Sequence, residues 1–319
     1  MTVDYRSSYT LYTRVVSGSV AGGRLRYNAA MVVQYDLHSH STASDGTLAP
    51  RELVACAARA GVGVLALTDH DTLEGISAAQ FAAAEYGLQF VPGIEISVTW
   101  QRRTVHILGL HVDPGNRQLR AGLQVLQSFR RWRAEEIGRR LEKSGITGTY
   151  SAASVLSAGG MMGRTHFARV LLREGHGKSL QKVFKRFLVR DKPGYVPGEW
   201  ATLDDAVHWI RAAGGQAVIA HPARYRLTAS KLTQLVEEFR ECSGTALEVV
   251  SGSHSAEENY KMARFAMRHQ LLGSQGSDYH GPEKRWVQLG KLPGLPADCP
   301  PIWGSDWWRA QSAAANNAA

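Results

Sequence analysis

From residue 32 onward, short runs of apolar, β-branched residues alternate with longer stretches of helical spacing. Apolar runs of this length between turn residues are typical of buried strands. We predict seven strands, at residues 32–37, 64–68, 89–91 with its continuation to 97, 105–111, 217–220, 247–250 and 271–274. A regular alternation of strands and helices indicates a parallel sheet covered by helices. The pattern therefore favours an α/β fold, a barrel of seven β/α units.

Helical segments follow most of these strands and have recognisable start and stop residues. Pro50 suits the first turn of a helix that runs to residue 60, and Gly61 can end it. Further helices of the barrel are predicted at residues 75–86, 203–213 and 255–269.

Residues 113–201 have a different character from the barrel on either side. Segments 119–141 and 167–188 read as basic amphipathic helices, and GTYSAASVL at 148–156 reads as a connection between helices. The Pro- and Gly-rich DKPGYVPG at 191–198 reads as a rigid return to the barrel. We therefore expect a small, basic helical domain at 113–201, inserted into a barrel made of residues 32–112 and 202–303.

Positive charge is concentrated in this insertion. Between Arg117 and Trp200 there are 17 Lys and Arg against 6 Asp and Glu, whereas the rest of the chain has 20 against 22. The net charge of +9 thus arises from one segment. Clustered positive charge favours an anionic partner, and a solvated helix face is the alternative interpretation.

The two ends of the chain and its cysteines bear on location. Residues 1–30 lack the compact apolar segment of a secretory signal. We interpret them as a disordered extension, with a misassigned start before Met31 as the alternative. The tail at 309–319 also reads as disordered. No apolar run approaches the roughly 20 residues that span a membrane, and the three cysteines show no paired spacing. These features predict a cytoplasmic protein with reduced thiols.

Histidine and carboxylate side chains recur where the predicted strands end. They lie in YDLHSHSTASDG, ALTDHDT, VPGIEIS, TVHILGL, VIAHPAR and GSDYH, and are His38, His40, Asp45, His70, Glu95, His106, His221, Asp278 and His280. Because the carboxyl ends of the strands of a β/α barrel share one mouth, we expect all nine to converge. His106 lies near the start of its strand, so its place at the mouth requires a short or shifted strand.

These residue types point to a metal site. Imidazole combined with carboxylate suits zinc, manganese or iron. Nine ligands exceed what one ion needs, whereas two or three ions that share a bridging carboxylate would use them, and such ions promote displacement at phosphorus. Taken singly, each residue has another interpretation; Asp45, for example, could form a turn before Gly46. Six of the twelve histidines at one predicted rim favour the metal interpretation.

Taken together, the motifs resemble those of the PHP (polymerase and histidinol phosphatase) superfamily. DLHSHSTASDG, LTDHDT, PGIEIS, HILG, AHPAR and GSDYH occur in the same order, and the resemblance covers residues 32–290. It implies a distorted seven-stranded β/α barrel with a multinuclear metal site that hydrolyses phosphate esters. Asp45 in place of a histidine, the helical insertion, and the phrases GRTHFAR and KPGYVP are similar to the group of RNase AM and the nucleoside 3′,5′-bisphosphate phosphatases.

The resemblance implies that the candidate ligands divide among two or three divalent ions. The first ion would be held by His38, His40, Glu95 and Asp278. The second would be held by Asp45, His70 and His280. The third would be held by Glu95, as a bridge, together with His106 and His221. A bridging hydroxide would be the nucleophile, and manganese is the expected ion, with iron or zinc as alternatives.

Phosphate recognition requires fixed cations, and the planar guanidinium group suits bidentate contact. Arg224, three residues after His221, is expected over the metal site. Arg164 in GRTHFAR is expected to reach in from the insertion, with His166 beside it as a phosphate contact or proton donor. The alternative for Arg164 and His166 is helix capping or surface packing, and the resemblance favours the phosphate role.

The leading hypothesis is a metal-dependent phosphoesterase that hydrolyses nucleoside 3′,5′-bisphosphates or short 5′-phosphorylated RNA from its 5′ end. The resemblance places both under one chemistry, because phosphorus at the 3′ oxygen of a 5′-phosphorylated nucleotide is attacked in each. We expect a nucleotide or short RNA as substrate, no membrane association and no obligatory protein partner.

Three alternatives remain. A histidinol phosphatase or another small-molecule phosphatase would share the fold, but Asp45 and GRTHFAR favour the nucleotide group. An amidohydrolase would usually have a lysine as its bridging ligand, where this chain has Glu95. A non-catalytic RNA-binding protein acting through the basic insertion predicts a degraded ligand set, whereas all nine positions hold competent ligands.

Overall fold

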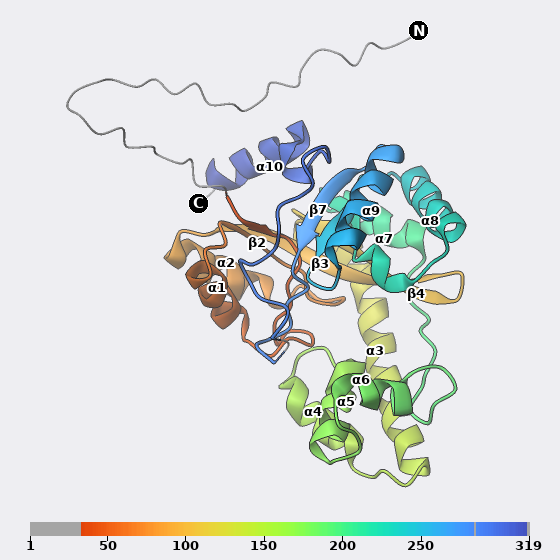
Figure 1. Ribbon diagram of the computed structural model, residues 1–319. Coiled ribbons are helices and arrows are strands. Elements are labelled where there is room, and N and C mark those ends of the chain that lie inside the picture. Colours follow the sequence, from red (N-terminus) through yellow and green to blue (C-terminus); the bar gives the residue numbers. More distant parts are fainter. Residues whose placement is uncertain (1–32, 284, 318–319) are drawn as a thin grey trace, which may run out of the picture. The chain divides into compact units, whose positions relative to one another are not determined.

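The computed structural model of the chain describes residues 33–283 and 285–317 (Figure 1). The predicted disordered extension at 1–30 lies outside the described residues. Seven strands form one sheet in sequential order: β1 (Tyr35–Asp36), β2 (Val64–Leu67), β3 (Gln89–Trp100), β4 (Arg103–Leu110), β5 (Gln216–Ile219), β6 (Ala246–Ser251) and β7 (Leu272–Gly276). The helices that cover it are α1 (Pro50–Arg59), α2 (Ile76–Tyr86), α7 (Leu203–Ala212), α8 (Ala229–Glu241) and α9 (Ala256–Arg268).

Hydrogen bonds from the residues just after β1 to the end of β7 and the segment that follows it nearly close the sheet into a barrel. The Leu37 N–H donates to the Gln275 carbonyl at 3.0 Å, and the Asp278 N–H donates to the His38 carbonyl at 2.8 Å. The strands alternate their side chains between two apolar layers. In β2, for example, Leu65 and Leu67 pack against α1 and α2, whereas their neighbours face the barrel interior. The predicted seven-stranded α/β barrel is thereby confirmed.

The prediction that all seven strands are parallel is wrong for β4, which runs antiparallel to β3 and β5. β3 and β4 are joined by Gln101 and Arg102 alone, which leaves no room for a crossover helix. Both turn residues have positive φ, 45° and 63°, as tight hairpins require. The reversal brings the start of β4 to the barrel mouth, with His106 paired to Ser97. His106 therefore reaches the rim without any shift of its strand.

The other end of the barrel is closed by the C-terminal segment, η3 (Ile302–Gly304) and α10 (Asp306–Asn317). Ile302 and Trp308 are buried in the cluster that fills the barrel interior, and Trp303 stacks on Tyr35 at 4.2 Å between ring centroids. The predicted disordered tail is wrong for residues 309–317, which continue a helix anchored by Trp308. Residues 318–319 lie outside the described part.

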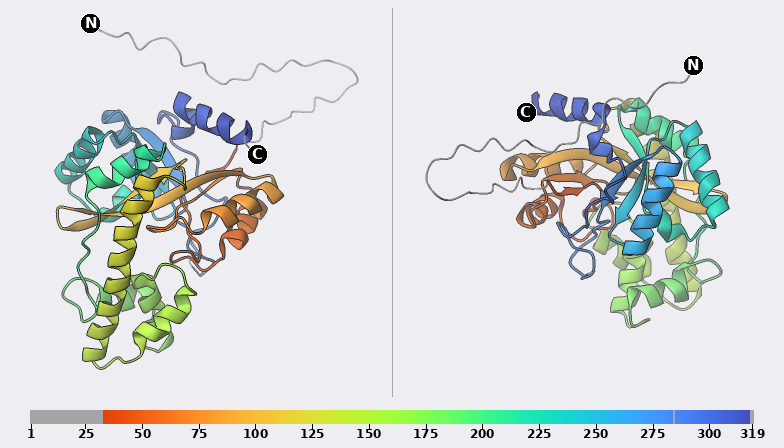
Figure 2. Two further views of the ribbon diagram at one scale, coloured as in Figure 1. Left: turned by 180° about the vertical axis from the view of Figure 1, so that it is seen from behind. Right: turned by 45° about the horizontal axis from the view of Figure 1, so that its top comes forward.

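Helices also fill the predicted insertion: α3 (Arg117–Lys143), α4 (Thr149–Ser157), α5 (Arg164–Arg173), α6 (Leu180–Val183) and a π-helical turn, η1 (Phe184–Leu188). The predicted connection at 148–156 is thus largely α4. α3 leaves the barrel and runs the length of the insertion (Figure 2). Its first half packs on the barrel core through Leu119 and Leu123, and its second half shares a separate core with Phe167 and Leu171. The return segment pairs with β3, where the Thr99 N–H donates to the Ala201 carbonyl at 2.9 Å.

Candidate metal centre

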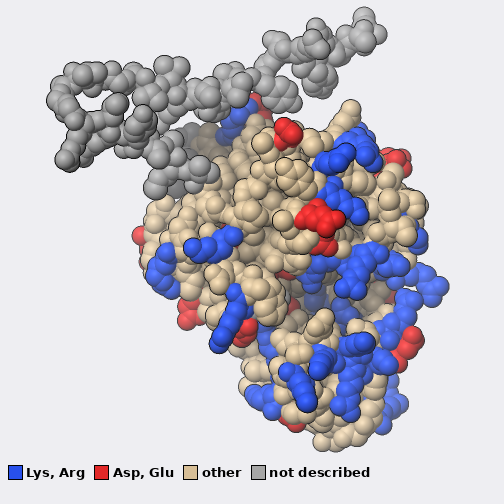
Figure 3. Space-filling model, viewed as in Figure 1, with Lys and Arg blue, Asp and Glu red and all other residues tan. Residues whose placement is uncertain are grey.

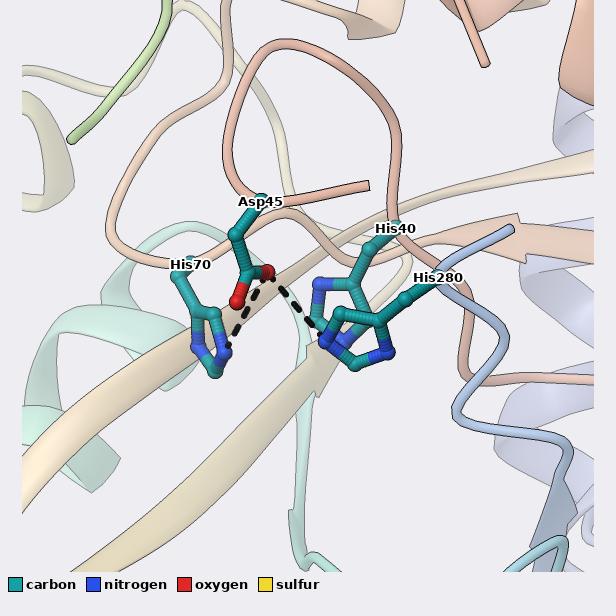
Figure 4. Close-up of side chains that lie close together, drawn as sticks. All are labelled: His40, Asp45, His70 and His280. Atoms are coloured by element: carbon teal, nitrogen blue, oxygen red, sulfur yellow. Dashed lines mark ion pairs between the residues drawn. The ribbon is translucent and has the colours of Figure 1, made fainter. Parts of the chain in front are cut away.

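All nine predicted ligands lie together at one rim of the barrel. They form four overlapping groups whose ligand atoms lie within 4.8 Å of one another: His40, Asp45, His70 and His280; His38, Glu95 and His221; His38, His40 and Asp278; and His70, Glu95 and His106. Figure 4 shows the first group, with the Asp45 carboxylate between the His70 and His280 rings. Segments from both ends of the barrel sequence thus supply one cluster.

Glu95 lies at the centre of the cluster and is fully buried. Its Oε1 is 2.7 Å from His106 Nδ1 and 3.1 Å from His221 Nε2. Its Oε2 is 2.9 Å from His70 Nδ1 and 3.2 Å from His40 Nε2. Each carboxylate oxygen therefore serves a different set of imidazoles, which is the arrangement that a bridging ligand requires.

The two aspartates join the histidines of the first and last motifs. Asp278 Oδ1 is 3.2 Å from His40 Nε2 and 3.5 Å from His38 Nε2. Asp45 Oδ1 is 3.2 Å from His280 Nε2 and 3.9 Å from His70 Nε2 (Figure 4).

The residues fit divalent metal ions. Asp45 Oδ1, Glu95 Oε2 and His70 Nδ1 are buried and lack a hydrogen-bond partner among the described residues. Glu95 Oε2 and His70 Nδ1 are within ion-pair distance but are not aligned as a hydrogen bond. Buried polar atoms without partners are costly, and mixed imidazole and carboxylate donors suit manganese, iron or zinc. Metal coordination would satisfy all three atoms.

The charge states also suit coordination. Burial by itself raises the pKa of Asp45, Glu95 and Asp278, but the surrounding histidines hold each pKa well below its ordinary range. Burial lowers the pKa of His221 to about 3, so this ring is neutral at neutral pH. Burial also opposes the charged form of His40, yet Asp278 and Glu95 raise its pKa to about 9. Metal binding must displace a proton there, which makes metal affinity depend on pH.

Glu248, a buried residue of β6, supports two of the histidines and was missed by the sequence analysis. His38 Nδ1 donates to Glu248 Oε1 at 3.0 Å, and the His221 backbone N–H donates to Glu248 Oε2. A carboxylate behind a ligating imidazole fixes its tautomer and orientation. The signal available in the sequence was a single acidic residue within the apolar run LEVVS.

Asp69 holds the loop that carries Asp45. It accepts hydrogen bonds from the Ser41 N–H at 2.8 Å, the Ser41 hydroxyl at 2.6 Å and the Ser44 hydroxyl. Gly46 completes the loop, because a Cβ there would collide with the His40 carbonyl. The position of Asp45 is therefore fixed by the loop rather than by the side chain alone.

The predicted phosphate contacts occupy two sides of the cluster. Arg224 lies in η2 (Pro222–Tyr225), the short helix that follows His221. Its guanidinium pairs with Asp278 Oδ2, while its side chain remains 46% exposed. His166 is buried at the start of α5, and its Nδ1 accepts from the Gly163 N–H at 3.0 Å. The predicted capping role therefore holds for His166 Nδ1. Because Nδ1 accepts, the neutral ring carries its proton on Nε2 and can still donate there.

Arg164 belongs to a group of guanidinium ions that the sequence analysis only partly identified. Arg130 Nε donates to Asp71 Oδ2 at 2.7 Å, and Arg133 donates to the Val196 carbonyl at 3.0 and 3.2 Å. Burial, with Arg164 and Arg130 nearby, lowers the pKa of Arg133 to about 9. Within the described part of the chain, Asp71 is the only carboxylate in salt-bridge contact with these three arginines. Three arginines with one carboxylate partner leave positive charge that favours the binding of an anion.

The insertion is fastened to the loop of the first motif. The Met161 N–H donates to the Ala43 carbonyl at 2.8 Å, and a Cβ at Gly160 would collide with the Thr42 carbonyl. On α3, Gln127 Nε2 donates to the Asp71 carbonyl at 3.0 Å. These contacts fix the start of α5 beside the metal centre.

Comparisons with known proteins agree with this geometry. A family model described as the PHP domain matches residues 36–196. A 3′,5′-nucleoside bisphosphate phosphatase from Chromobacterium violaceum is 45% identical over 269 residues, covering 84% of this chain and 94% of the relative. The 5′-3′ exoribonuclease Rnm of Escherichia coli is 43% identical over 273 residues, covering 85% of this chain and 93% of the relative.

Two solved structures share the fold. A structure from Chromobacterium violaceum, described as an amidohydrolase with bound sulfate and no metal, has a TM-score of 0.82 and 44% identity and covers 87% of this chain and 95% of its own. A candidate metal-dependent phosphoesterase from Bifidobacterium adolescentis has a TM-score of 0.72 and 28% identity at the same coverages. None of the helices in the described part of this chain has the length and apolar character needed to cross a membrane.

Proposed function

The chain belongs to the PHP domain family, and from that premise we propose that it hydrolyses phosphate esters of nucleotides. Its substrates are nucleoside 3′,5′-bisphosphates and short 5′-phosphorylated RNA, from which it releases nucleoside 5′-monophosphates. Relatives that cover most of this chain, named as a bisphosphate phosphatase and as an exoribonuclease, support both substrates.

The observation that carries the proposal is the pairing of a nine-residue ligand cluster with arginines that lack carboxylate partners. The cluster supplies sites for metal ions, and Arg164 and Arg133 supply positive charge with no salt-bridge partner among the described residues. A phosphate ester is the substrate class that needs both features at once.

Two or three divalent ions, with manganese preferred, would supply an activated water and positive charge for the oxygens at phosphorus when bound. In our assignment the first ion would be held by His38, His40, Glu95 and Asp278. The second would be held by Asp45, His70 and His280. The third would be held by His106 and His221 together with Glu95.

The remaining polar side chains bind and orient the substrate. Arg224 lies next to Asp278 and holds the phosphate that is cleaved. Arg164 holds the 5′-phosphate, and His166 donates a hydrogen bond through Nε2 to a phosphate oxygen. The planar guanidinium group is suited to bidentate contact with such oxygens. A substrate with a 5′-hydroxyl lacks the phosphate that Arg164 would contact.

A substrate panel with added manganese tests the proposal. It compares 3′,5′-bisphosphoadenosine, a short 5′-phosphorylated RNA, the same RNA with a 5′-hydroxyl, and histidinol phosphate. Turnover of the first two is expected, with the 5′-hydroxyl RNA much slower. Turnover of histidinol phosphate alone would overturn the assignment to nucleotides. Protein loaded with metal but inactive on all four would instead favour the non-catalytic RNA-binding alternative.

A further inference from the structure

A basic pocket lies at the tip of the hairpin formed by β3 and β4, away from the metal centre. Its volume is about 390 Å³, and its lining is Gln101, Arg102, Arg103, Arg190 and Lys231. Four of these five side chains are cationic. No carboxylate lines the pocket within the described part of the chain, although Asp191 follows Arg190 in the sequence.

The pocket is built by the fold and not by a local run of charges. Arg102 and Arg103 belong to the hairpin of the barrel, Arg190 follows the π-helical turn of the insertion, and Lys231 lies in the first turn of α8. All four cations are exposed and make no salt bridge with the residues that the structure describes. Their charges are therefore available to an external anion.

An acidic side chain of α8 that contacts the end of β3 is already engaged. Glu238 accepts a hydrogen bond from Trp100 Nε1 at 2.6 Å and another from Gln234 Nε2 at 2.9 Å. The residues of the turn are not those that favour its backbone conformation. Asn-Gly suits two consecutive positive φ angles best, whereas this turn has Gln101 and Arg102. The arginine in the turn is thus not explained by the stability of the hairpin.

The position of the pocket decides what it can bind. Gln101 is six residues beyond Glu95 along β3, which corresponds to about 20 Å of extended strand. This separation is about six nucleotides at a rise of about 3.4 Å per nucleotide, the value for a strand with stacked bases. Figure 3 shows lysine and arginine side chains gathered in the hollow between the barrel and the insertion. A mononucleotide at the metal centre cannot reach the pocket, but an RNA strand can.

We propose that this pocket binds the phosphodiester backbone of an RNA substrate, several nucleotides downstream of the phosphate that is cleaved. The pocket favours RNA longer than about six nucleotides over shorter RNA and over bisphosphates. The inference rests on the proposed function, whose substrate range it deepens.

The test replaces two cations of the pocket with neutral side chains of similar length, Arg103→Gln together with Lys231→Gln. The matched control is Arg264→Gln with Arg268→Gln, which removes the same charge from exposed positions on α9. KM is measured for 5′-phosphorylated RNA of about twelve and about three nucleotides and for 3′,5′-bisphosphoadenosine, at several salt concentrations.

The pocket variant is expected to raise KM for the longer RNA roughly tenfold and to reduce the salt dependence of log KM by about 1.4, or about 0.7 per lost phosphate contact. KM for the short RNA and for the bisphosphate stays within about twofold, as does every value for the control. Equal effects on all three substrates, or an unchanged KM for the longer RNA, would overturn the proposal.

A direct binding measurement separates this proposal from the proposed function. The dissociation constant of the longer RNA is measured by fluorescence anisotropy without added metal, for the wild type and both variants. Weaker binding by the pocket variant alone supports the pocket even for a protein that turns over none of these substrates. Arg190→Gln, at another lining residue of the pocket, is also expected to weaken binding of the longer RNA. Unchanged binding in either pocket variant would contradict the proposal.

Discussion

Glu95 and the two rim residues Asp45 and His280 show how single side chains define the metal centre. Glu95 offers one carboxylate oxygen to His106 and His221 and the other to His40 and His70. The Asp45–His280 pair lies at the edge, where a substitution changes the ligand set without opening the core. Removal of an edge ligand is therefore the cleanest test of the assignment.

His280→Ala is expected to lower the number of bound metal ions per chain by one and activity on 3′,5′-bisphosphoadenosine by at least about 100-fold, since even residues behind the ligands contribute up to this factor. Metal content is measured by elemental analysis. The control is His269→Ala, at the end of α9 and outside the cluster, which should keep metal and activity. Full metal content in His280→Ala would contradict the assignment of the second ion.

Glu248→Gln tests a residue that positions ligands and does not itself coordinate. The amide keeps the size of the side chain but loses the charge that supports His38 and His221. Metal affinity is expected to fall about 10- to 100-fold, as measured by titration of the metal-free protein with manganese. Activity should return at saturating manganese, whereas a loss that excess metal does not restore would indicate a different role.

The metal ligands could be predicted from the sequence, whereas Glu248 and Arg130 could not, and the reason is physical. The candidate ligands occur in short motifs whose residue types reveal their chemistry. Glu248 contacts His38 across 210 residues of sequence, and Arg130 contacts Asp71 across 59. Neither pair has a spacing that could be recognised before the fold brings its members together.

At the scale of elements, α10 and its contact with His111 are the clearest departure from expectation. The tail was predicted to be disordered because its end is rich in Ala and Asn. The helix is held by Trp308, whose ring packs edge-on against His111 at 4.4 Å between centroids. This anchor depends on a partner that is distant in sequence, so composition alone could not reveal it.

His111 should make stability depend on pH. Burial lowers its pKa to about 4 in the folded chain, whereas the unfolded value is about 6.5. Protonation therefore favours the unfolded chain. The contribution of this neutral ring to stability is fully present above about pH 6.5 and is lost as the pH falls toward 4. Between about pH 8 and pH 5, titration of this group should lower the free energy of unfolding by about 2 kcal/mol.

Urea unfolding at both pH values measures the effect, with His111→Asn as the comparison, since asparagine tolerates the positive φ of 57° at this position. The variant should lose about 2 kcal/mol less than the wild type over this range. Equal losses in the two proteins would show that His111 does not titrate in this window.

The hairpin of β3 and β4 is the second departure at this scale. Gln101 and Arg102 carry none of the Gly or Asn signals that mark a two-residue turn. Apolar runs do not specify strand direction, so the run at 105–111 was assigned to a parallel unit. The one sign of this error in the sequence was the position of His106 near the start of its apolar run. The antiparallel direction of β4 accounts for that position.

At the scale of the whole molecule, metal binding should couple to folding. Ligands drawn from segments throughout the chain converge only in the folded state, so metal ions stabilise that state by mass action. Manganese at about 100 times its dissociation constant should add about 2.7 kcal/mol to the free energy of unfolding. Thermal unfolding with manganese and then with excess chelator measures the shift. A midpoint that does not change with either would contradict the presence of a metal centre.

The alternation of strands and helices, together with the order of the motifs, was sufficient to predict the seven-stranded barrel and its membership in the PHP domain family. The docking of the insertion was not predictable in the same way. It involves the backbone contact from Met161 to Ala43, for which Gly160 leaves room, and side-chain contacts from α3 to Asp71. Backbone contacts of this kind have no signature in side-chain composition.

Closure of the barrel between β1 and β7 also has a consequence for biosynthesis. His38 is among the first described residues to be synthesised, but Asp278 and His280 follow some 240 residues later and join it only when the ring closes. A chain that ends before residue 272 lacks both late ligands and the strand that completes the ring. The complete ligand cluster can therefore form only after residues 278 and 280 have been synthesised and the ring has closed.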